Sequence, residues 1–510
     1  MAMAMASGSL LLGLLAQQAA GQLLVPQSPP AGASEPVPKG VSSFSIEFSS
    51  AIDYLGNATH PNEYSRNLLS NLKNAVGAFP KIRIGGTTQD RTFYNPNQNE
   101  AMNLTYETPT DDQPIKVTYG PDFFSSYHAI PGLEFSHSLN LAYNGSDQST
   151  QLSSAAAAAC KHMGSTLRLS ELGNEPDFYS GYPSYTRPPN WTMAEYIREW
   201  NWKSGVVAKA MKEECPGINV GFAAPSLIWS NWSGRAPWDP QDVFRKGLDT
   251  RFIHEISMHN YMDTDYEERY GLTDLSIQSL LMNHTGVVGS VAVHIDAAQK
   301  LSYLGLPYTL NEVNGMALQG GAWTWSMGSA LWVVDFALWS ATNVKHQTHQ
   351  LSPRQPVCVD GAKPSTRPPY YGQMMVAHAL GNSNSTRLTN IPLPSDTESA
   401  YAVYHDNALS RLVTLNLEAW YANSTTPRPS KEYTFRVPSR YTTANVLRFM
   451  GPGADARSNL TFGGVSYDFE LGGGKPVTVD VMGLKERVSV NDGLVKVDVP
   501  ASSGVVLILG

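Results

Sequence analysis

The chain has 510 residues, of which 42% are hydrophobic and 16% charged, and its formal net charge is −8. A chain of this length and composition is able to bury a large core and predicts about two domains. No run of Lys or Arg forms a basic stripe. This argues against nucleic acid or a highly sulfated polyanion as a partner, because both require an excess of positive charge.

The N-terminus predicts export from the cell. A short apolar run, SGSLLLGLL, is followed by small residues, which is typical of a signal peptide over residues 1–21. This run is too short to span a bilayer, and no later stretch of apolar residues is long enough, so no membrane association is expected. A secreted, extracellular glycoprotein is therefore predicted. Nine sequons support it, at Asn57, Asn103, Asn144, Asn190, Asn231, Asn283, Asn384, Asn423 and Asn459.

The cysteines limit covalent cross-linking and metal binding. The chain contains only Cys160, Cys215 and Cys358. At most one intrachain disulfide can form, and the sequence leaves the pairing open. No Cys/His spacing resembles a metal site, so neither a metal nor an organic cofactor is expected.

Short strands alternate with longer helices from residue 42 to about residue 350. Expected strands are 42–49, 81–86, 133–143, 167–176, 218–227, 255–262, 306–314 and 343–350, and expected helices include 61–79, 192–215, 287–305 and 325–343. This alternation indicates parallel βαβ units, and eight of them suit a closed (β/α)8 TIM barrel. The barrel is assigned to residues 41–365, after a Pro- and Gly-rich leader over residues 22–40 that can add a strand to the C-terminal domain.

Composition changes after residue 365. Alternating, Thr- and Val-rich runs such as RLVTLNLEAWY and KPVTVDVM follow one another with tight turns between them. Asn491-Asp492-Gly493 between two such runs is a hairpin signal. Residues 366–510 are therefore predicted to form an antiparallel β-sandwich, which makes the fold class α/β with an all-β C-terminal domain.

Two glutamates stand at the ends of predicted barrel strands. Glu175 lies in ELGNEPD at the end of strand four, and Glu312 lies in NEVNG at the end of strand seven. Side chains at the C-terminal ends of barrel strands converge on one mouth. Two carboxylates about 5–5.5 Å apart can flank a glycosidic bond, where one attacks the anomeric carbon and the other protonates the leaving oxygen. A single Asn-Glu-Pro is more often a turn or a helix start, but the two motifs together favour catalysis.

The amide beside the first glutamate fits the same chemistry. Asn174 can bond the sugar 2-hydroxyl, a contact that strengthens in the transition state. Glu47 and Thr87 follow predicted strands one and two and can bind other hydroxyls of the terminal sugar. Ordinary alternatives are a solvated strand-end charge for Glu47 and a turn residue for Thr87.

The motifs ELGNEPDFY and NEVNG, with RIGGTTQD and SMHNY, resemble glycoside hydrolase family 79, which holds β-glucuronidases and heparanases. The resemblance covers nearly the whole chain and is closest to microbial exo-β-glucuronidases. It implies a retaining enzyme with Glu175 as acid/base and Glu312 as nucleophile. It also implies that Tyr261 bonds the nucleophile and that His259 lines the subsite, unless His259 is a core residue.

The resemblance further implies that tyrosine hydroxyls and backbone N–H groups hold the uronic carboxylate. Candidates are Gly320 and Gly321 after the nucleophile strand and Tyr370 and Tyr371 in RPPYYG. Glycine allows a backbone to approach a ligand closely, although a plain loop explains Gly-Gly equally well.

The expected substrate is a terminal β-D-glucuronosyl or 4-O-methyl-glucuronosyl residue of an oligo- or polysaccharide, for example on arabinogalactan. One alternative is a heparanase-like endo-β-glucuronidase, which the net charge of −8 disfavours. Another is a different β-glycosidase of the same clan. An alternative of another class is a non-catalytic carbohydrate-binding protein, which the presence of both glutamates disfavours.

Overall fold

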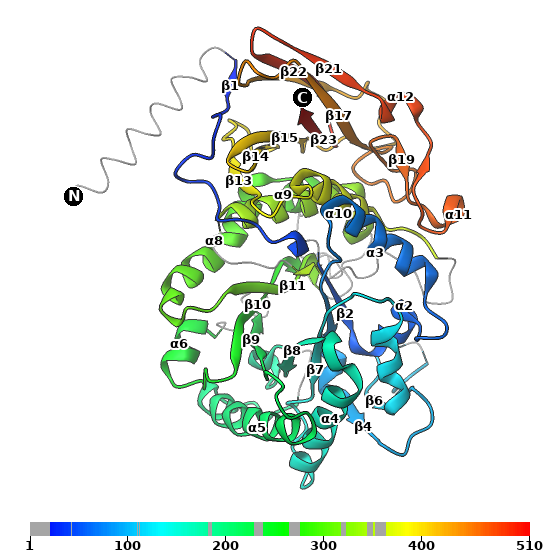
Figure 1. Cartoon of the computed structure of the whole chain (residues 1–510), viewed down its shortest axis with the longest axis vertical. Helices are drawn as coiled ribbons and strands as arrows, with labels where there is room; N and C mark the ends of the chain where they lie inside the picture. The colour runs from blue at the N-terminus through cyan, green and yellow to red at the C-terminus, as the bar shows by residue number, and fades with distance from the viewer. Residues whose placement is uncertain are drawn as a thin grey trace, which may run out of the picture.

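The computed structural model consists of a barrel domain with a β-domain stacked against it (Figure 1). It describes residues 21–41, 43–109, 111, 113–181, 186–228, 238–264, 276–317, 323–343, 350–351 and 364–510.

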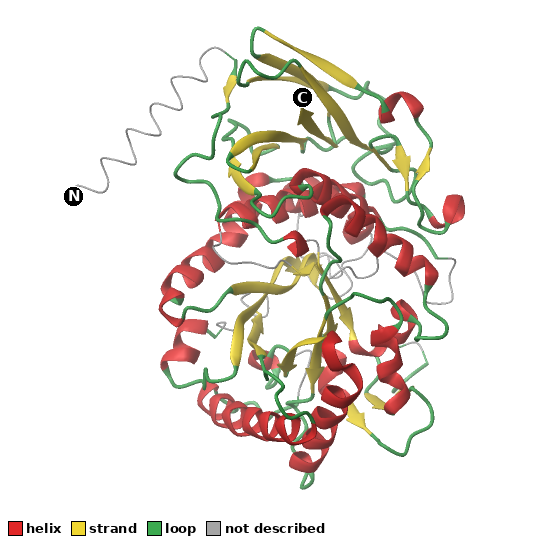
Figure 2. Ribbon diagram, viewed as in Figure 1, coloured by secondary structure: helices red, strands yellow, loops and turns green. Residues whose placement is uncertain are grey.

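A parallel sheet of eight strands, in the order β11-β10-β9-β8-β7-β3-β2-β12, forms the centre of the barrel. The first and last strands in this order, β11 and β12, contact each other, so the sheet curls into a ring that helices surround (Figure 2). The strands are β2 (Ser43–Glu47), β3 (Ile82–Gly85), β7 (Phe135–Leu139), β8 (Leu167–Leu172), β9 (Phe222–Ile228), β10 (Ile253–Thr264), β11 (Tyr308–Ala317) and β12 (Gln350–Leu351).

The predicted barrel is confirmed, and seven of its strands overlap the predicted runs. The eighth was expected over residues 343–350. Of that stretch, 344–349 lie outside the described residues, and β12 pairs with β2 just beyond them.

Helices α3 (Glu63–Val76) and α5 (Met193–Glu214) show why the chain forms helices around the sheet. The Asn62 side chain accepts the Ser65 N–H at the start of α3, and Gly77 ends that helix in the left-handed conformation. Thr192 and Glu195 form a reciprocal capping box at the start of α5. The other long helices are α4 (Gln148–Met163), α8 (His284–Lys300), α9 (Met327–Asn343) and α10 (Pro368–Leu380). Within the described part of the chain, no helix is both long and apolar enough to cross a membrane.

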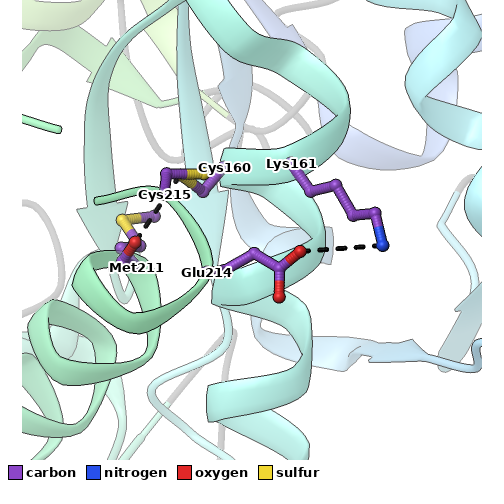
Figure 3. Close-up of a disulfide and its surroundings, with 5 residues drawn as sticks. All are labelled: Cys160, Lys161, Met211, Glu214 and Cys215. Atoms are coloured by element: carbon purple, nitrogen blue, oxygen red, sulfur yellow. Dashed lines mark hydrogen bonds and ion pairs between the residues drawn. A yellow bond between two sulfur atoms is a disulfide. The ribbon is translucent and has the colours of Figure 1, made fainter. Parts of the chain in front are cut away.

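A disulfide between Cys160 and Cys215 joins the C-terminal ends of α4 and α5. Figure 3 shows this bond beside an ion pair between Lys161 and Glu214, whose Nζ and Oε1 atoms are 3.6 Å apart. The bond closes a loop of 55 residues. Restricting the unfolded chain in this way stabilises the fold by about 4 kcal/mol. The pairing that the sequence left open is thereby settled for these two cysteines, and Cys358 lies outside the described residues.

The C-terminal domain is a multistranded, mainly antiparallel sheet folded around its own core. Its main strands follow the order β1-β16-β22-β21-β17-β23-β15-β14-β13. Phe435 and Val497 from one half of the sheet share a core with Leu412 and Leu507 from the other half, which confirms the predicted β-sandwich. The bounds are β13 (Arg387–Asn390), β14 (Glu398–His405), β15 (Ala408–Asn416), β16 (Ser430–Arg436), β17 (Thr443–Met450), β21 (Arg487–Asn491), β22 (Leu494–Pro500) and β23 (Ser503–Leu509).

The leader was expected to add a strand to the C-terminal domain, and that domain was expected to begin at residue 366. Strand β1 (Leu23–Leu24) pairs in parallel with β16, so the leader contributes to the β-domain. Helix α10 follows the expected boundary but packs on α3 and α9 of the barrel, and the next strand of the β-domain begins only at Arg387. Because α10 is buried on nearly all sides, its sequence lacks the polar stripe that identifies a surface helix.

The barrel and the β-domain meet at a buried charged cluster. The Asp335 carboxylate in α9 lies 2.9 Å from the ring Nδ1 of His284 in α8, and it accepts the Tyr401 hydroxyl of β14 at 2.6 Å. Burial lowers the pKa of His284, but the charge and hydrogen bond of Asp335 outweigh this, so the net pKa is raised.

This pair predicts a pH-dependent stability. A raised histidine pKa stabilises the fold fully below the ordinary value of 6.5, and the stabilisation is lost as pH rises through the folded-state pKa. We expect His284→Gln to lower the thermal unfolding midpoint more at about pH 5.5 than at about pH 8.5. Tyr401→Phe, which removes a hydrogen bond from this cluster but no group that titrates between these pH values, should lower it similarly at both. An equal loss at both pH values in His284→Gln would contradict the assignment.

Candidate active site

Glu175 and Glu312 meet at the mouth of the barrel. Glu175 lies in the loop between β8 and the short helix η6 (Pro176–Phe178), and Glu312 lies on β11. One carboxylate oxygen of each and a ring nitrogen of His259 all lie within 4.8 Å of one another. The structure therefore brings together two glutamates that are far apart in the sequence, close enough for one sugar ring to contact both, as a retaining glycosidase requires.

Glu312 is held as a carboxylate. Its Oε1 accepts the hydroxyl of Tyr261 from β10, and its Oε2 accepts an N–H of Arg83 from β3. Burial raises the pKa of Glu312, but the positive charge of Arg83, the nearby His259 and these hydrogen bonds lower it to about 2. The bond that the family resemblance implied for Tyr261 is present.

Glu175 is in the opposite situation. Its Oε1 lies 2.9 Å from Nδ1 of His259, whose ring also approaches Glu312 at 3.9 Å. Burial raises the pKa of Glu175 and the repulsion from Glu312 adds to this, while the contact with His259 only partly offsets them. Neighbouring carboxylates whose environments drive their pKa values apart are suited to separate roles as a proton donor and an ionised group. His259 is thus part of the site and lies between the two glutamates.

The backbone aims Glu175 from a loop and not from a strand. Its φ is 49°, in the left-handed region that a residue with a side chain seldom occupies. The Glu175 N–H donates to the carbonyl of Ser226 at 3.0 Å, which ties this loop to the end of β9 (Phe222–Ile228). Such a conformation persists only where the surrounding contacts hold it.

A buried arginine that the sequence analysis missed lies beneath both motifs. The guanidinium of Arg83 bonds Glu171 through Nε at 2.9 Å and also through Nη2, and it bonds Asn174 Oδ1 at 2.8 Å and Ser45 Oγ at 2.7 Å. With Glu312, these contacts use all five of its N–H groups. Arg83 stands between Ile82 and Ile84 in a four-residue strand, so its side chain faces the barrel interior. That position was the signal that could have identified it.

The predicted residues Asn174, Glu47 and Thr87 lie at or just after the C-terminal ends of barrel strands. Asn174 is buried, and its oxygen accepts from Arg83, so its amide orientation is fixed. Glu47 stands at the end of β2, where its carboxylate accepts the hydroxyl of Thr88 at 3.1 Å and the amide of Gln113 at 3.3 Å. Gly86, with φ 81°, passes so close that a Cβ there would lie 2.0 Å from Glu47 Oε2. Thr87 is half-buried beside these residues.

The assignment of Tyr370 and Tyr371 to a sugar carboxylate is corrected. Both lie on α10, and the Tyr370 hydroxyl donates to the carbonyl of Leu68 in α3 at 2.9 Å. The Tyr371 hydroxyl donates to Asp468 of the β-domain at 2.9 Å. These hydroxyls join helices and domains and are not available at the barrel mouth. The other carboxylate candidates, Gly320 and Gly321, lie outside the described residues.

The site also contains the one group of described His, Cys, Asp and Glu side chains close enough to hold a single metal ion, namely Glu175, His259 and Glu312. The guanidinium of Arg83 already bonds Glu312 there. A divalent cation would be repelled by this fixed positive charge, so the donor set suits proton transfer better than metal binding.

Known proteins resemble the chain over nearly its whole length. It is 37% identical to a β-glucuronidase of Aspergillus niger, over 95% of this chain and 93% of the relative. It is 32% identical to a β-glucuronidase of Neurospora crassa, over 95% of each. Residues 400–506 match the glycosyl hydrolase family 79 C-terminal beta domain.

The solved structures agree in fold. A crystal structure of a 4-O-α-L-rhamnosyl-β-D-glucuronidase from Fusarium oxysporum superposes with a TM-score of 0.79 at 21% identity, over 96% of this chain and all of that one. A family 51 α-L-arabinofuranosidase from Bifidobacterium longum gives 0.58 at 14% identity, over 95% of this chain and all of that one.

The barrel, its β-domain and these relatives define a glycoside hydrolase. Its identity to the curated relatives and the match of its C-terminal domain show which one: the chain belongs to glycoside hydrolase family 79.

Proposed function

We propose that this protein is a retaining, exo-acting β-glucuronidase that releases terminal β-D-glucuronosyl or 4-O-methyl-glucuronosyl residues from glycans such as arabinogalactan. The observation that carries the mechanism is the pair Glu175 and Glu312. One carboxylate oxygen of each lies within 4.8 Å of the other, and their pKa values are shifted in opposite directions. The two fungal relatives, both β-glucuronidases, support the choice of a uronide.

In this proposal the reaction has two displacements. The ionised Glu312 attacks the anomeric carbon while Glu175 gives its proton to the departing glycosidic oxygen, which leaves a glycosyl ester on Glu312. Glu175, now a carboxylate, takes a proton from water, whose oxygen attacks the same carbon and releases Glu312. The sugar keeps its β configuration because the carbon is inverted twice.

The surrounding residues support each step. Arg83 and Tyr261 keep Glu312 ionised and directed, since both donate to its oxygens. Because the Asn174 oxygen accepts from Arg83, its NH₂ group is left to donate to the sugar 2-hydroxyl. Glu47, with Thr88 and Gly86 beside it, offers a carboxylate to further hydroxyls of the terminal sugar.

A second candidate is a heparanase-like endo-enzyme, which the net charge of −8 disfavours for sulfated chains. Another β-glycosidase specificity is compatible with the same pair of glutamates. A non-catalytic carbohydrate-binding protein does not require two glutamates with opposed pKa shifts.

Hydrolysis of p-nitrophenyl β-glucuronide, β-glucoside and β-galactoside separates these functions. We expect release from the glucuronide and none from the other two. We also expect Glu312→Gln, which is isosteric but cannot attack, to abolish turnover while circular dichroism shows an intact fold. Release from the glucoside alone would overturn the uronide assignment, absence of release from all three would favour a binding protein, and near-normal turnover in Glu312→Gln would reject the mechanism.

The pH profile tests the proposed role of Glu312. Only the carboxylate is nucleophilic, so kcat/KM falls as pH drops through the Glu312 pKa of about 2. Tyr261→Phe removes one hydrogen bond to the ionised form, so the acid limb should move upward, toward the ordinary value of 4.5. We expect kcat/KM at its optimum to fall about tenfold or more. An acid limb that stays in place would show that Tyr261 does not act on the nucleophile.

We further propose that the protein is secreted as a glycoprotein. The N-terminal apolar run and the Cys160–Cys215 disulfide, a bond typical of oxidising compartments, support this. Six sequon asparagines are exposed: Asn103, Asn144, Asn190, Asn384, Asn423 and Asn459. We expect a eukaryotic secretory host to release the protein into the medium, with an apparent mass that falls on treatment with peptide-N-glycosidase. Retention in the cell without a change in mass would contradict secretion.

A further inference from the structure

We propose that Asp90 is a positioning residue that holds the loop carrying Glu175 and so directs its proton toward the leaving oxygen. This inference rests on the proposed acid/base role of Glu175. Asp90 lies in the short helix η3 (Thr87–Arg91), which follows β3.

The Asp90 carboxylate connects three loops at the barrel mouth. Asp90 Oδ2 accepts the backbone N–H of Asn174 at 2.9 Å and the hydroxyl of Tyr179 at 2.6 Å. Its Oδ1 accepts the backbone N–H groups of Leu141 at 3.0 Å and Ala142 at 3.3 Å. Asp90 therefore joins the loop after β3, in which it lies, to the loops after β7 and β8. Strands β3, β7 and β8 are the second, third and fourth strands of the barrel in chain order.

The two contacts to the loop after β8 lie on either side of the acid/base residue. Asn174 immediately precedes Glu175, and Tyr179 follows it by one turn. Glu175 itself has φ 49°, and its N–H is bound by Ser226. A residue in that conformation depends on fixed neighbours, and a proton donor displaced by about 1 Å can lose roughly 10²-fold in rate.

The loop after β7 is also held through its backbone carbonyl groups, so its N–H groups are fixed partners for Asp90. The Leu141 carbonyl accepts from Nζ of Lys203 at 2.6 Å, and the Ala142 carbonyl accepts from the guanidinium of Arg187. Both cations also bond Glu199. The backbone N–H groups of Leu141 and Ala142 thus donate to the Asp90 carboxylate, and their carbonyl groups accept from the two cations.

The Asp90 network requires an ionised carboxylate. Burial raises the pKa of Asp90 to about 6, although the bonds from Tyr179, Asn174, Ala142 and Leu141 lower it in part. The group is therefore charged at neutral pH and can accept from all four donors. An asparagine of the same shape must turn an NH₂ group toward one pair of them, which leaves those donors unpaired.

The test uses the dependence of the rate on the leaving group. Phenyl β-glucuronide needs protonation of its leaving oxygen, whereas 2,4-dinitrophenyl β-glucuronide hardly does, and kcat/KM reports this first displacement. Glu175→Ala provides the reference, with a loss of about 10²- to 10⁴-fold on the phenyl substrate and little on the dinitrophenyl one. We expect Asp90→Asn to lose about 10- to 100-fold on the phenyl substrate while the dinitrophenyl substrate is little changed.

Two further variants make the result decisive. Tyr179→Phe removes a single donor to Asp90 and should show a smaller loss of the same selective kind, and it decides the outcome if Asp90→Asn does not fold. Asp335→Asn removes another buried carboxylate, at the domain interface, and should lower the unfolding midpoint with an unchanged ratio between the substrates.

Equal losses on both substrates, or no loss, in the folded Asp90 or Tyr179 variant would overturn this inference alone. Absence of a selective loss in Glu175→Ala would instead overturn the acid/base assignment, and the role of Asp90 with it.

Discussion

The structure depends on one buried cation shared by two carboxylates. Arg83 reaches from β3 to Glu171 on β8 and to Glu312 on β11, so a single guanidinium ties together strands from different parts of the barrel wall. Removing such a group from water is costly unless every donor is paired, and here all five N–H groups are. The same contact lowers the pKa of Glu312. The interaction that makes a charged barrel core tolerable is therefore also one that keeps Glu312 ionised.

The two glutamates are held in physically different ways. Glu312 stands on the barrel strand β11, and direct hydrogen-bond donors set its charge state, so its position follows from the barrel itself. Glu175 stands on a loop in a left-handed conformation, and its raised pKa follows mainly from burial. In its proposed role as proton donor, Glu175 needs a neutral form and a fixed direction, and both depend on the loops that surround it. Glu175 therefore depends on residues that hold its loop, such as Asp90, in a way that the strand residue Glu312 does not.

The sequence predicted the parts of this arrangement that have a local pattern. Strand and helix alternation gave the barrel, and the Asn-Glu motifs at strand ends located Glu175, Glu312 and Asn174. Arg83 was missed because its partners are contributed by distant strands, and no spacing in the chain records them. The Tyr370 and Tyr371 assignment rested on the family resemblance and was wrong, because both residues lie on the buried helix α10, where their hydroxyls bond Leu68 and Asp468.

Two buried helices and the N-terminal leader connect the β-domain to the barrel. Helix α9 packs between strand β11 of the barrel and strand β13 of the β-domain. Helix α10 packs on α3 and α9 of the barrel and on strands β15, β17 and β23 of the β-domain, so both helices are buried on nearly all sides. The leader adds to this connection, since β1 pairs with β16 and Arg436 on that strand bonds Gln22. An unpaired β16 would be an exposed edge, and its pairing with Leu23 and Leu24 of the leader protects it.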